Sequence, residues 1–271
     1  MLLWCAAVGV DAARADSVVT LETRKGVTQS FLLLEPKGQV RGALVMLPGH
    51  EGEVEFRGTS ENGYEIKNVG GGLTAHRAMR ETLRRNGFAV AVIAPPSDRT
   101  QLAAWFRKSD EHVEDMRGVI AYLQKRYNAK PYLQGHCLAT FSAASVATRL
   151  RGDGISGLIL TSTRSTGRDG SVTDFDRGAV NVPVLLVHHR EDSCPQSPYQ
   201  NIEGVKRFYQ ESAPRVDLIT VTGGGELRAR RNPNCQDGYH GFRGVQRDTA
   251  QAIASWLLGK DFPSLVEGPK R

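Results

Sequence analysis

The stretch PYLQGHCLATFSAAS, residues 131–145, holds the feature on which the fold and the chemistry depend. An apolar run ends at Gly135, and a helical pattern begins at Leu138. Cys137 stands between the two, at the tip of a predicted strand-to-helix turn. The start of a helix favours a thiolate, so this cysteine is a candidate nucleophile. A small buried side chain is the ordinary alternative, and the surrounding elements must distinguish the two.

The composition indicates one globular domain. The chain has 271 residues, of which 40% are hydrophobic and 24% charged, and it contains no low-complexity linker or internal repeat. We expect the domain to span residues 16–260, followed by a C-terminal tail over 261–271. Apart from the N-terminal segment, no apolar stretch approaches the roughly 18 residues that cross a bilayer, so membrane insertion is not expected.

The first residues, MLLWCAAVGVDAARADS, resemble a secretory signal peptide. An apolar stretch over 2–10 precedes Ala13-Arg14-Ala15, a small-x-small pattern at which signal peptidases cleave. This predicts a signal peptide over residues 1–15 and a periplasmic or secreted protein. The basic residues that usually open such a segment are missing, which leaves a frayed or buried N-terminal segment and a cytoplasmic protein as the alternative.

The basic balance of the chain does not indicate a nucleic-acid partner. The formal net charge is +6 and the sequence pI is about 9.2. The densest basic run, LRARRNPN at 227–234, has no interleaved aromatic residues and no nucleic-acid motif around it. We therefore expect a solvated basic surface.

Short apolar runs alternate with helical patterns along the whole chain. Most runs from the third onward are continuously apolar, as in parallel strands buried on both faces. We expect strands at 17–23, 30–36, 42–49, 88–96, 131–135, 157–162, 182–189 and 216–223, and helices at 73–87, 109–127, 138–150, 201–211 and 247–259. This order predicts an α/β fold with a doubly wound sheet whose first two strands are antiparallel at one edge.

Three polar residues follow strands at the edge where such sheets place their sites. They are Cys137, Asp192 and His240, in the order nucleophile, acid and histidine. This order, with the Gly135-x-Cys137-x-Ala139 turn, resembles the α/β-hydrolase superfamily, whose nucleophile turn reads G-x-S-x-G. The resemblance extends from about residue 20 to residue 259. It implies a mostly parallel doubly wound sheet with helices on both faces and no large cap domain.

The resemblance also assigns roles around the nucleophile. It implies a Cys137–His240–Asp192 catalytic triad, with backbone amides of Leu138 and His50 as the oxyanion hole. The segment VMLPGHEG at 45–52 would be the oxyanion loop. Gly49, Glu51 and His136 are the expected pocket residues.

Other acidic residues and histidines compete for the last two triad positions. The rival acids are Glu191, Asp174 and Asp176, but only Asp192 stands a few residues past a buried strand where this superfamily places its acid. His188 and His189 end a strand, so we expect them to be structural.

The thiol is a departure from most members, which carry serine. Dienelactone hydrolases and polyester synthases are relatives that use cysteine. Because a thiolate leaves easily, a cysteine enzyme favours substrates whose own leaving group is good. We therefore expect a small-molecule acyl substrate, namely an activated ester, a lactone or a thioester, cleaved through an acyl-thioester on Cys137. Acyl transfer, a non-catalytic binding protein and an engineered replacement of serine remain alternatives.

Several further expectations complete the sequence-based description. No nucleotide or metal motif is present, so no cofactor or metal is implied, and the oligomeric state is not predicted. If Asp192 and His240 meet, Cys194 and Cys235 lie on adjacent loops and can form a disulfide, which an oxidising compartment would preserve. The polar segment 53–72 is long for a connection and is either a cover over the site or a surface loop.

Overall fold

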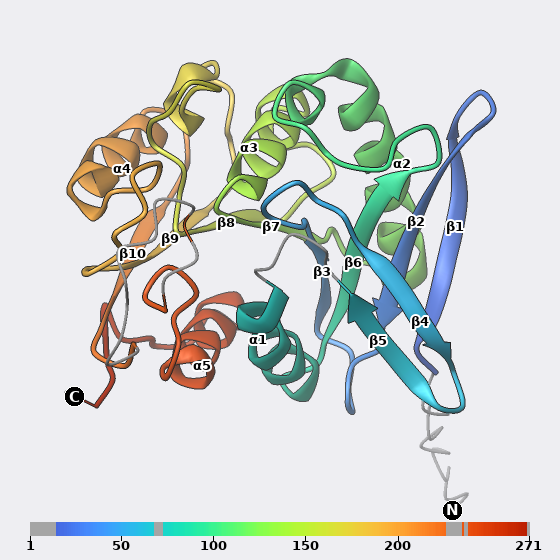
Figure 1. The fold of residues 1–271 in the computed structure, drawn as a ribbon, viewed down its shortest axis with the longest axis horizontal. Coiled ribbons are helices and arrows are strands. Elements are labelled where there is room, and N and C mark those ends of the chain that lie inside the picture. Colours follow the sequence, from blue (N-terminus) through green and yellow to red (C-terminus); the bar gives the residue numbers. More distant parts are fainter. Residues whose placement is uncertain (1–14, 68–72, 226–234, 236–237, 270–271) are drawn as a thin grey trace, which may run out of the picture.

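The computed structural model describes residues 15–67, 73–225, 235 and 238–269 (Figure 1). A nine-stranded sheet runs through the centre with helices on both of its faces. The predicted α/β fold is confirmed. The expected signal peptide, apart from Ala15, and the basic run at 227–234 lie outside the described residues.

The sheet has the order β1-β2-β6-β3-β7-β8-β9-β10-β11. The first pair and the β2–β6 pair are antiparallel, and every other pair is parallel. Its strands are β1 (Ser17–Arg24), β2 (Val27–Leu34), β3 (Gly42–Met46), β6 (Phe88–Pro96), β7 (Tyr132–His136), β8 (Gly157–Thr161), β9 (Val184–His189), β10 (Val216–Thr222) and β11 (Leu265–Glu267). Strands β3, β8 and β9 are buried at every residue, as their continuous apolar sequences predict.

Helices cover both faces of the sheet and divide the core into two clusters. One side carries α2 (Asp110–Tyr127), α3 (Ala139–Arg149) and α4 (Ile202–Gln210), and the other carries α1 (Leu73–Arg85) and α5 (Gln246–Leu257) (Figure 1). The largest helix, α2, begins where Ser109 accepts a hydrogen bond from the His112 amide and ends at Asn128, whose φ of 51° is left-handed. No helix in the described part of the chain is long and apolar enough to span a bilayer.

Two segments differ from their sequence-based description. Residues 55–67, within the segment expected to be a cover or a surface loop, form a hairpin of β4 (Glu55–Thr59) and β5 (Gly63–Lys67). Its alternating side chains place Phe56, Tyr64 and Ile66 against the core cluster of α1 and α5. Residues 265–267, expected in a tail, form β11 and extend the sheet beyond β10, because Val266 buries its side chain in the same cluster.

Candidate active site

Cys137 lies in a strained turn between β7 and α3. Its φ is 53°, a left-handed conformation that is costly for a residue with a side chain. The turn is held by hydrogen bonds from the Cys137 amide to the carbonyl of Thr161 at 3.1 Å and from the Thr140 amide to the Cys137 carbonyl at 3.0 Å. A Cβ on Gly135 would lie 2.4 Å from the carbonyl oxygen of Ala139, so the strand and the helix cross where only glycine fits.

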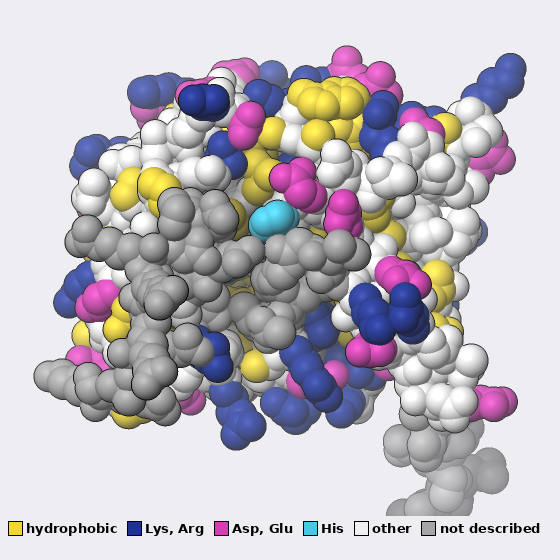
Figure 2. All heavy atoms as spheres, in the orientation of Figure 1, with side chains coloured by type: hydrophobic (Ala, Val, Ile, Leu, Met, Phe, Trp, Pro, Cys, Tyr) yellow, Lys and Arg dark blue, Asp and Glu magenta, His cyan; other side chains and the backbone are white. Residues whose placement is uncertain are grey.

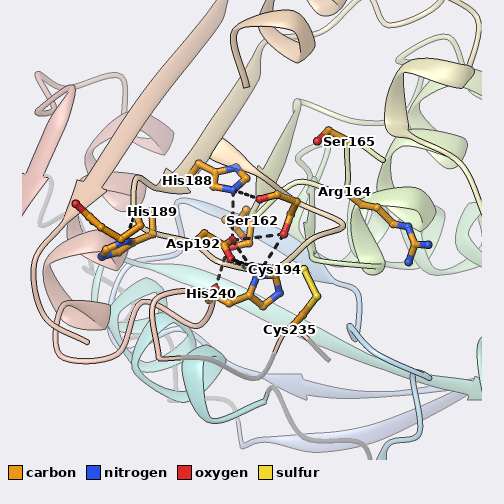
Figure 3. Close-up of polar contacts among 12 residues, drawn as sticks. Ser162, Arg164, Ser165, His188, His189, Asp192, Cys194, Cys235 and His240 are labelled. Carbon is orange, nitrogen blue, oxygen red and sulfur yellow. Dashed lines mark hydrogen bonds and ion pairs between the residues drawn. A yellow bond between two sulfur atoms is a disulfide. The ribbon is translucent and has the colours of Figure 1, made fainter. Parts of the chain in front are cut away.

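Asp192 and His240 meet beside this turn, although they are far apart in the sequence (Figure 3). The Nδ1 of His240 is 2.9 and 3.1 Å from the two carboxylate oxygens of Asp192. The amide of Cys194 donates to Asp192 Oδ1 at 2.9 Å, and Ser197 Oγ lies 3.4 Å from Oδ2. Both carboxylate oxygens therefore have hydrogen-bond partners, and the carboxylate is fixed in its orientation toward His240.

The rival acids lie in other environments. The carboxylate of Asp174 accepts from the amide of Ser171 and caps its own short helix. Asp176 accepts from the amide of Gly178. Glu191 pairs with His189 at 3.1 Å. Asp192 is the acid of this group that contacts His240.

His188 is a second histidine on the same carboxylate. Its Nε2 donates to the carbonyl of Ser197 at 2.8 Å and lies 3.3 Å from Asp192 Oδ2. Asp192 therefore lies between the imidazoles of His188 and His240 (Figure 3). The sequence indicated only a structural histidine here, since nothing in a strand-end His-His pair shows which ring faces the acid.

The Cys137 thiol and the His240 imidazole form a hydrogen-bonded pair. The Cys137 Sγ lies within 4.8 Å of a His240 ring nitrogen. Burial raises the pKa of Cys137, but the positive imidazole and the amide of Leu138 outweigh it and lower that pKa below its ordinary value. Burial also lowers the pKa of His240, yet the charges of Cys137 and Asp192 hold that pKa well above its ordinary value. The pair therefore favours a thiolate and an imidazolium.

Asp192 remains ionised beside this pair. Burial raises its pKa, but His240 and His188 outweigh the burial and hold the pKa of the carboxyl well below its usual range. A permanent negative charge at this position stabilises the protonated form of His240.

The other expected pocket residues surround the turn at β7. His136 is buried, its Nδ1 is 3.0 Å from Thr161 Oγ1, and its ring centroid lies 5.0 Å from that of His240. Gly49 lies against the backbone of β7, since a Cβ there would come within 3.0 Å of the His136 carbonyl oxygen. Glu51 is exposed, and its carbonyl accepts from the amide of Leu102 at 2.6 Å.

A buried arginine, which the sequence did not reveal, holds the expected oxyanion loop. Arg107 is 0% exposed and donates from Nη2 to the carbonyl of His50 at 3.0 Å. It also donates to Ser142 Oγ at 2.9 Å and to the carbonyl of Leu102 at 2.8 Å. His50 has a φ of 49°, so its loop depends on such support.

The charge of Arg107 acts on the thiol as well. Burial lowers the pKa of Arg107 to about 9, while the negative groups of Cys137 and Glu51 act in the opposite direction. The guanidinium is therefore positive at neutral pH and favours the Cys137 thiolate. The sequence Phe106-Arg107-Lys108 is typical of an ordinary polar connection. It therefore predicts neither the support of the His50 loop nor the positive charge near Cys137.

Cys194 and Cys235 are joined by a disulfide across the acid and histidine loops (Figure 3). The two residues are 41 positions apart, and their Cα atoms lie 4.5 Å apart. This is the pair expected from the meeting of Asp192 and His240. Among the described cysteines, Cys137 is the one outside the bond.

Two groups of side chains have the spacing of metal ligands. They are Cys137, Cys235 and His240, and Asp192, Cys194 and His240. Each group includes one sulfur of the disulfide, which carries no thiolate while the bond is intact. While the disulfide is intact, each group of described residues therefore offers two good metal ligands and not three, and the arrangement fits nucleophilic chemistry better.

The charges of the molecule are mixed on the face drawn in Figure 2. A histidine side chain reaches the surface near the middle of this face, beside acidic side chains. Lys and Arg side chains gather at the lower edge of the view and are interspersed with acidic ones elsewhere, so the described residues visible on this face form no single basic stripe.

Comparison with known proteins identifies the architecture. No protein-family model matches the sequence, and no curated protein matches it either. Among solved structures, a thermostable carboxyl esterase from Bacillus coagulans has a TM-score of 0.60 at 12% identity, over 91% of this chain and 99% of that one. The fold is that of the α/β hydrolases.

Two further structures show the same α/β-hydrolase architecture. Est1E from Butyrivibrio proteoclasticus has a TM-score of 0.58 at 17% identity, covering 91% of this chain and 98% of that one. XC6422 from Xanthomonas campestris, described as an α/β serine hydrolase without a lid, has a TM-score of 0.53 at 14% identity, over 88% and 95% of the two chains. The similarity extends over most of each chain, so the whole described domain adopts this fold.

Proposed function

We propose that this protein is a hydrolase that cleaves activated esters, lactones or thioesters through an acyl-thioester on Cys137. The observation that carries the proposal is the line of contacts from Asp192 through His240 to Cys137, at a strained turn between β7 and α3. A buried acid, an imidazole and a thiolate in this order are the parts that nucleophilic acyl transfer requires. The esterases among the structural neighbours add support from the fold alone.

In the first step the Cys137 thiolate attacks the carbonyl carbon of the substrate. The negative charge that develops on the carbonyl oxygen is stabilised by backbone amides of Leu138 and His50. The amide of Leu138 already interacts with the Cys137 sulfur, and Arg107 fixes the carbonyl of His50. The leaving group takes the proton of His240 as the tetrahedral intermediate collapses to the acyl-thioester.

In the second step a water molecule attacks the thioester. His240 removes a proton from the water and Asp192 stabilises the resulting imidazolium. The Cys137 thiolate then departs and the carboxylic acid is released. Because a thiolate leaves more readily than an alkoxide or an amine, the first step proceeds forward most readily when the departing group of the substrate is also good. We therefore favour activated esters, lactones and thioesters over amides as substrates.

A chromogenic short-chain ester and a matching thioester test the proposal. We expect the wild-type protein to hydrolyse both, and mass spectrometry of quenched reactions to find the acyl group on Cys137. The Cys137→Ala variant should lose turnover and retain its fold, since alanine removes only the sulfur. Cys137→Ser is the matched nucleophile variant and shows whether the site accepts oxygen on ordinary esters.

Two outcomes would redirect the interpretation. Full activity in Cys137→Ala would exclude this residue as the nucleophile. Binding of esters without turnover in the wild-type protein would favour a binding protein on a hydrolase scaffold. Adding an alcohol or amine acceptor to the same assay separates hydrolysis from acyl transfer, because transfer yields the acylated acceptor in place of the free acid.

A further inference from the structure

The candidate nucleophile lies beside the disulfide. The Sγ atoms of Cys137 and Cys235 and a ring nitrogen of His240 lie within 4.8 Å of one another. Cys194, the other half of the disulfide, belongs to the second group, in which its Sγ lies within 4.8 Å of His240 and Asp192. One imidazole is therefore close to all three sulfur atoms, and Cys235 is the disulfide sulfur grouped with Cys137.

We propose that this cluster carries out an internal thiol–disulfide exchange that moves the disulfide from Cys194–Cys235 to Cys137–Cys235. The Cys137 thiolate attacks the Sγ of Cys235, and a sulfur–sulfur bond forms between them. The bond between Cys235 and Cys194 breaks, and its electron pair leaves on the Cys194 sulfur. One disulfide is lost and one is gained, so the step needs no external oxidant or reductant.

The proton balance of this step uses the same histidine. The lowered pKa of Cys137 and the raised pKa of His240 favour the form of the pair in which His240 holds the proton of the thiol. Once Cys137 is bonded to Cys235, the negative charge has moved to Cys194, whose sulfur lies close to the His240 ring. His240 donates the proton to this leaving thiolate, which completes the exchange. The reverse reaction, attack by Cys194 on Cys235, restores the original linkage.

The exchange has a consequence for the proposed hydrolase, on which this part of the inference rests. Cys137 in a disulfide cannot attack a carbonyl, so the rearranged form is dormant. An acyl group on Cys137 removes the thiolate and blocks the exchange. Substrate therefore keeps the protein in its active linkage, and a dithiol reductant, which opens either disulfide, restores the thiolate of Cys137.

Linkage mapping of the wild-type protein tests the exchange directly. The protein is held without reductant at about pH 5 and about pH 8, quenched in acid, alkylated and digested for mass spectrometry. We expect a Cys137–Cys235 peptide together with alkylated Cys194, and we expect both to increase with pH as more thiolate is present. Saturation with the ester should suppress them. A Cys194–Cys235 linkage in every molecule at both pH values would overturn the proposal.

Two single variants provide a matched pair. Reduced Cys194→Ser and Cys235→Ser proteins are each treated with oxidised glutathione and then weighed by mass spectrometry. In Cys194→Ser, we expect Cys137 and Cys235 to form an internal disulfide, with loss of ester hydrolysis that dithiothreitol reverses. In Cys235→Ser, we expect Cys137 to retain one glutathione, because Cys194 lies outside its group. The same product in both variants would contradict the assignment of Cys235 as the exchanging sulfur.

These experiments distinguish failure of the disulfide exchange from failure of the proposed ester hydrolysis. Movement of the disulfide without any ester hydrolysis would leave the exchange intact and remove the proposed function. Ester hydrolysis with an immobile disulfide would do the opposite. The wild-type mapping does not depend on the variants, so it remains decisive if removal of the disulfide prevents either variant from folding.

Discussion

Asp192 controls the protonation of the thiol–imidazole pair through His240, although it does not bond to the sulfur itself. Its ionised carboxylate contacts Nδ1 of His240 at 2.9 Å. This charge raises the pKa of His240, and the imidazolium lowers the pKa of Cys137 by more than the direct repulsion between Asp192 and the thiolate raises it. The thiolate is present above the lowered pKa of Cys137 and is lost as the pH falls through it.

Replacing Asp192 by Asn should therefore move the ionisation of Cys137 to higher pH. The amide leaves His240 less protonated. The rate of alkylation of Cys137 by iodoacetamide at neutral pH should therefore fall by about tenfold for each unit by which the pKa of Cys137 rises. Ester hydrolysis should fall by about 10²–10⁴. Alkylation and hydrolysis are followed from acid to alkaline pH. Glu191→Gln is the control, because Glu191 pairs with His189, and equal profiles for both variants would contradict this role.

Arg107 has two separable effects, a positive charge near the thiol and a hydrogen bond that holds the His50 loop. The Arg107→Lys variant loses the planar set of donors, and the burial that lowers the pKa of Arg107 also favours the neutral form of a lysine at this position. We expect kcat to fall by about 10²-fold in Arg107→Lys, with a smaller change in KM. The pH midpoint of Cys137 alkylation reports the charge separately, and we expect Arg107→Met to raise it at least as much as Arg107→Lys does.

The control for this prediction is Arg99→Met. The guanidinium carbon of Arg99 lies 4.7 Å from the ring centroid of Trp105 and 4.5 Å from that of Phe106. Arg99 is thus a nearby arginine that contacts aromatic rings, and its replacement should leave kcat unchanged. Unchanged kcat in Arg107→Lys would show that the donors of the guanidinium do not position the loop. Sequence reasoning could not find Arg107, because a buried arginine and an exposed one are identical in sequence and only the folded loop encloses it.

At the scale of the element, the turn between β7 and α3 depends on Gly135. An added Cβ would meet backbone atoms of Ala139 at 2.4 and 2.7 Å, and backbone cannot move aside as a flexible side chain can. We expect Gly135→Ala to lower the free energy of unfolding by about 1–3 kcal/mol and to abolish ester hydrolysis. Thermal unfolding and the ester assay measure the two effects.

Gly204→Ala in α4 is the matched comparison. Outside the backbone of its own helix and its chain neighbours, no described atom lies within 4 Å of its added Cβ, and alanine favours a helix by about 1 kcal/mol over glycine. This variant should be as stable as the wild type or more so. If Gly135→Ala were equally well tolerated, the close crossing of strand and helix would not be the reason for glycine at that position.

The elements themselves were largely predictable, and the exceptions have a physical cause. The five helices lie close to their expected ranges because amphipathic patterns and end signals such as Ser109 and Asn128 are local. The hairpin β4–β5 was not predicted, since its strands are short and polar on one side. They are held by packing of Phe56 and Tyr64 on a distant core cluster, which no local pattern reports.

For the whole molecule, chain order and buried strands were enough to predict the sheet apart from β11, and the edge at which the site lies. The meeting of Asp192 and His240 was expected from that edge together with the resemblance to the α/β hydrolases, and the disulfide was expected from the meeting. The second histidine, His188, and the proximity of Cys137 to Cys235 did not follow. They depend on side-chain directions at the ends of loops, which strand order leaves undetermined.

The short strand β11 gives the sheet an order of completion during biosynthesis. It pairs in parallel with β10 through Thr220–Leu265 and the next two pairs, so each residue of β11 follows its partner in the chain by 45 positions. On a ribosome that adds roughly 5–20 residues per second, β10 emerges several seconds before β11. During that interval the nascent chain presents an unpaired strand edge, which is a template for association with other chains. Pairing with β11 therefore covers this part of the β10 edge, and a nascent chain that stalls before residue 265 would leave it open to association with other chains.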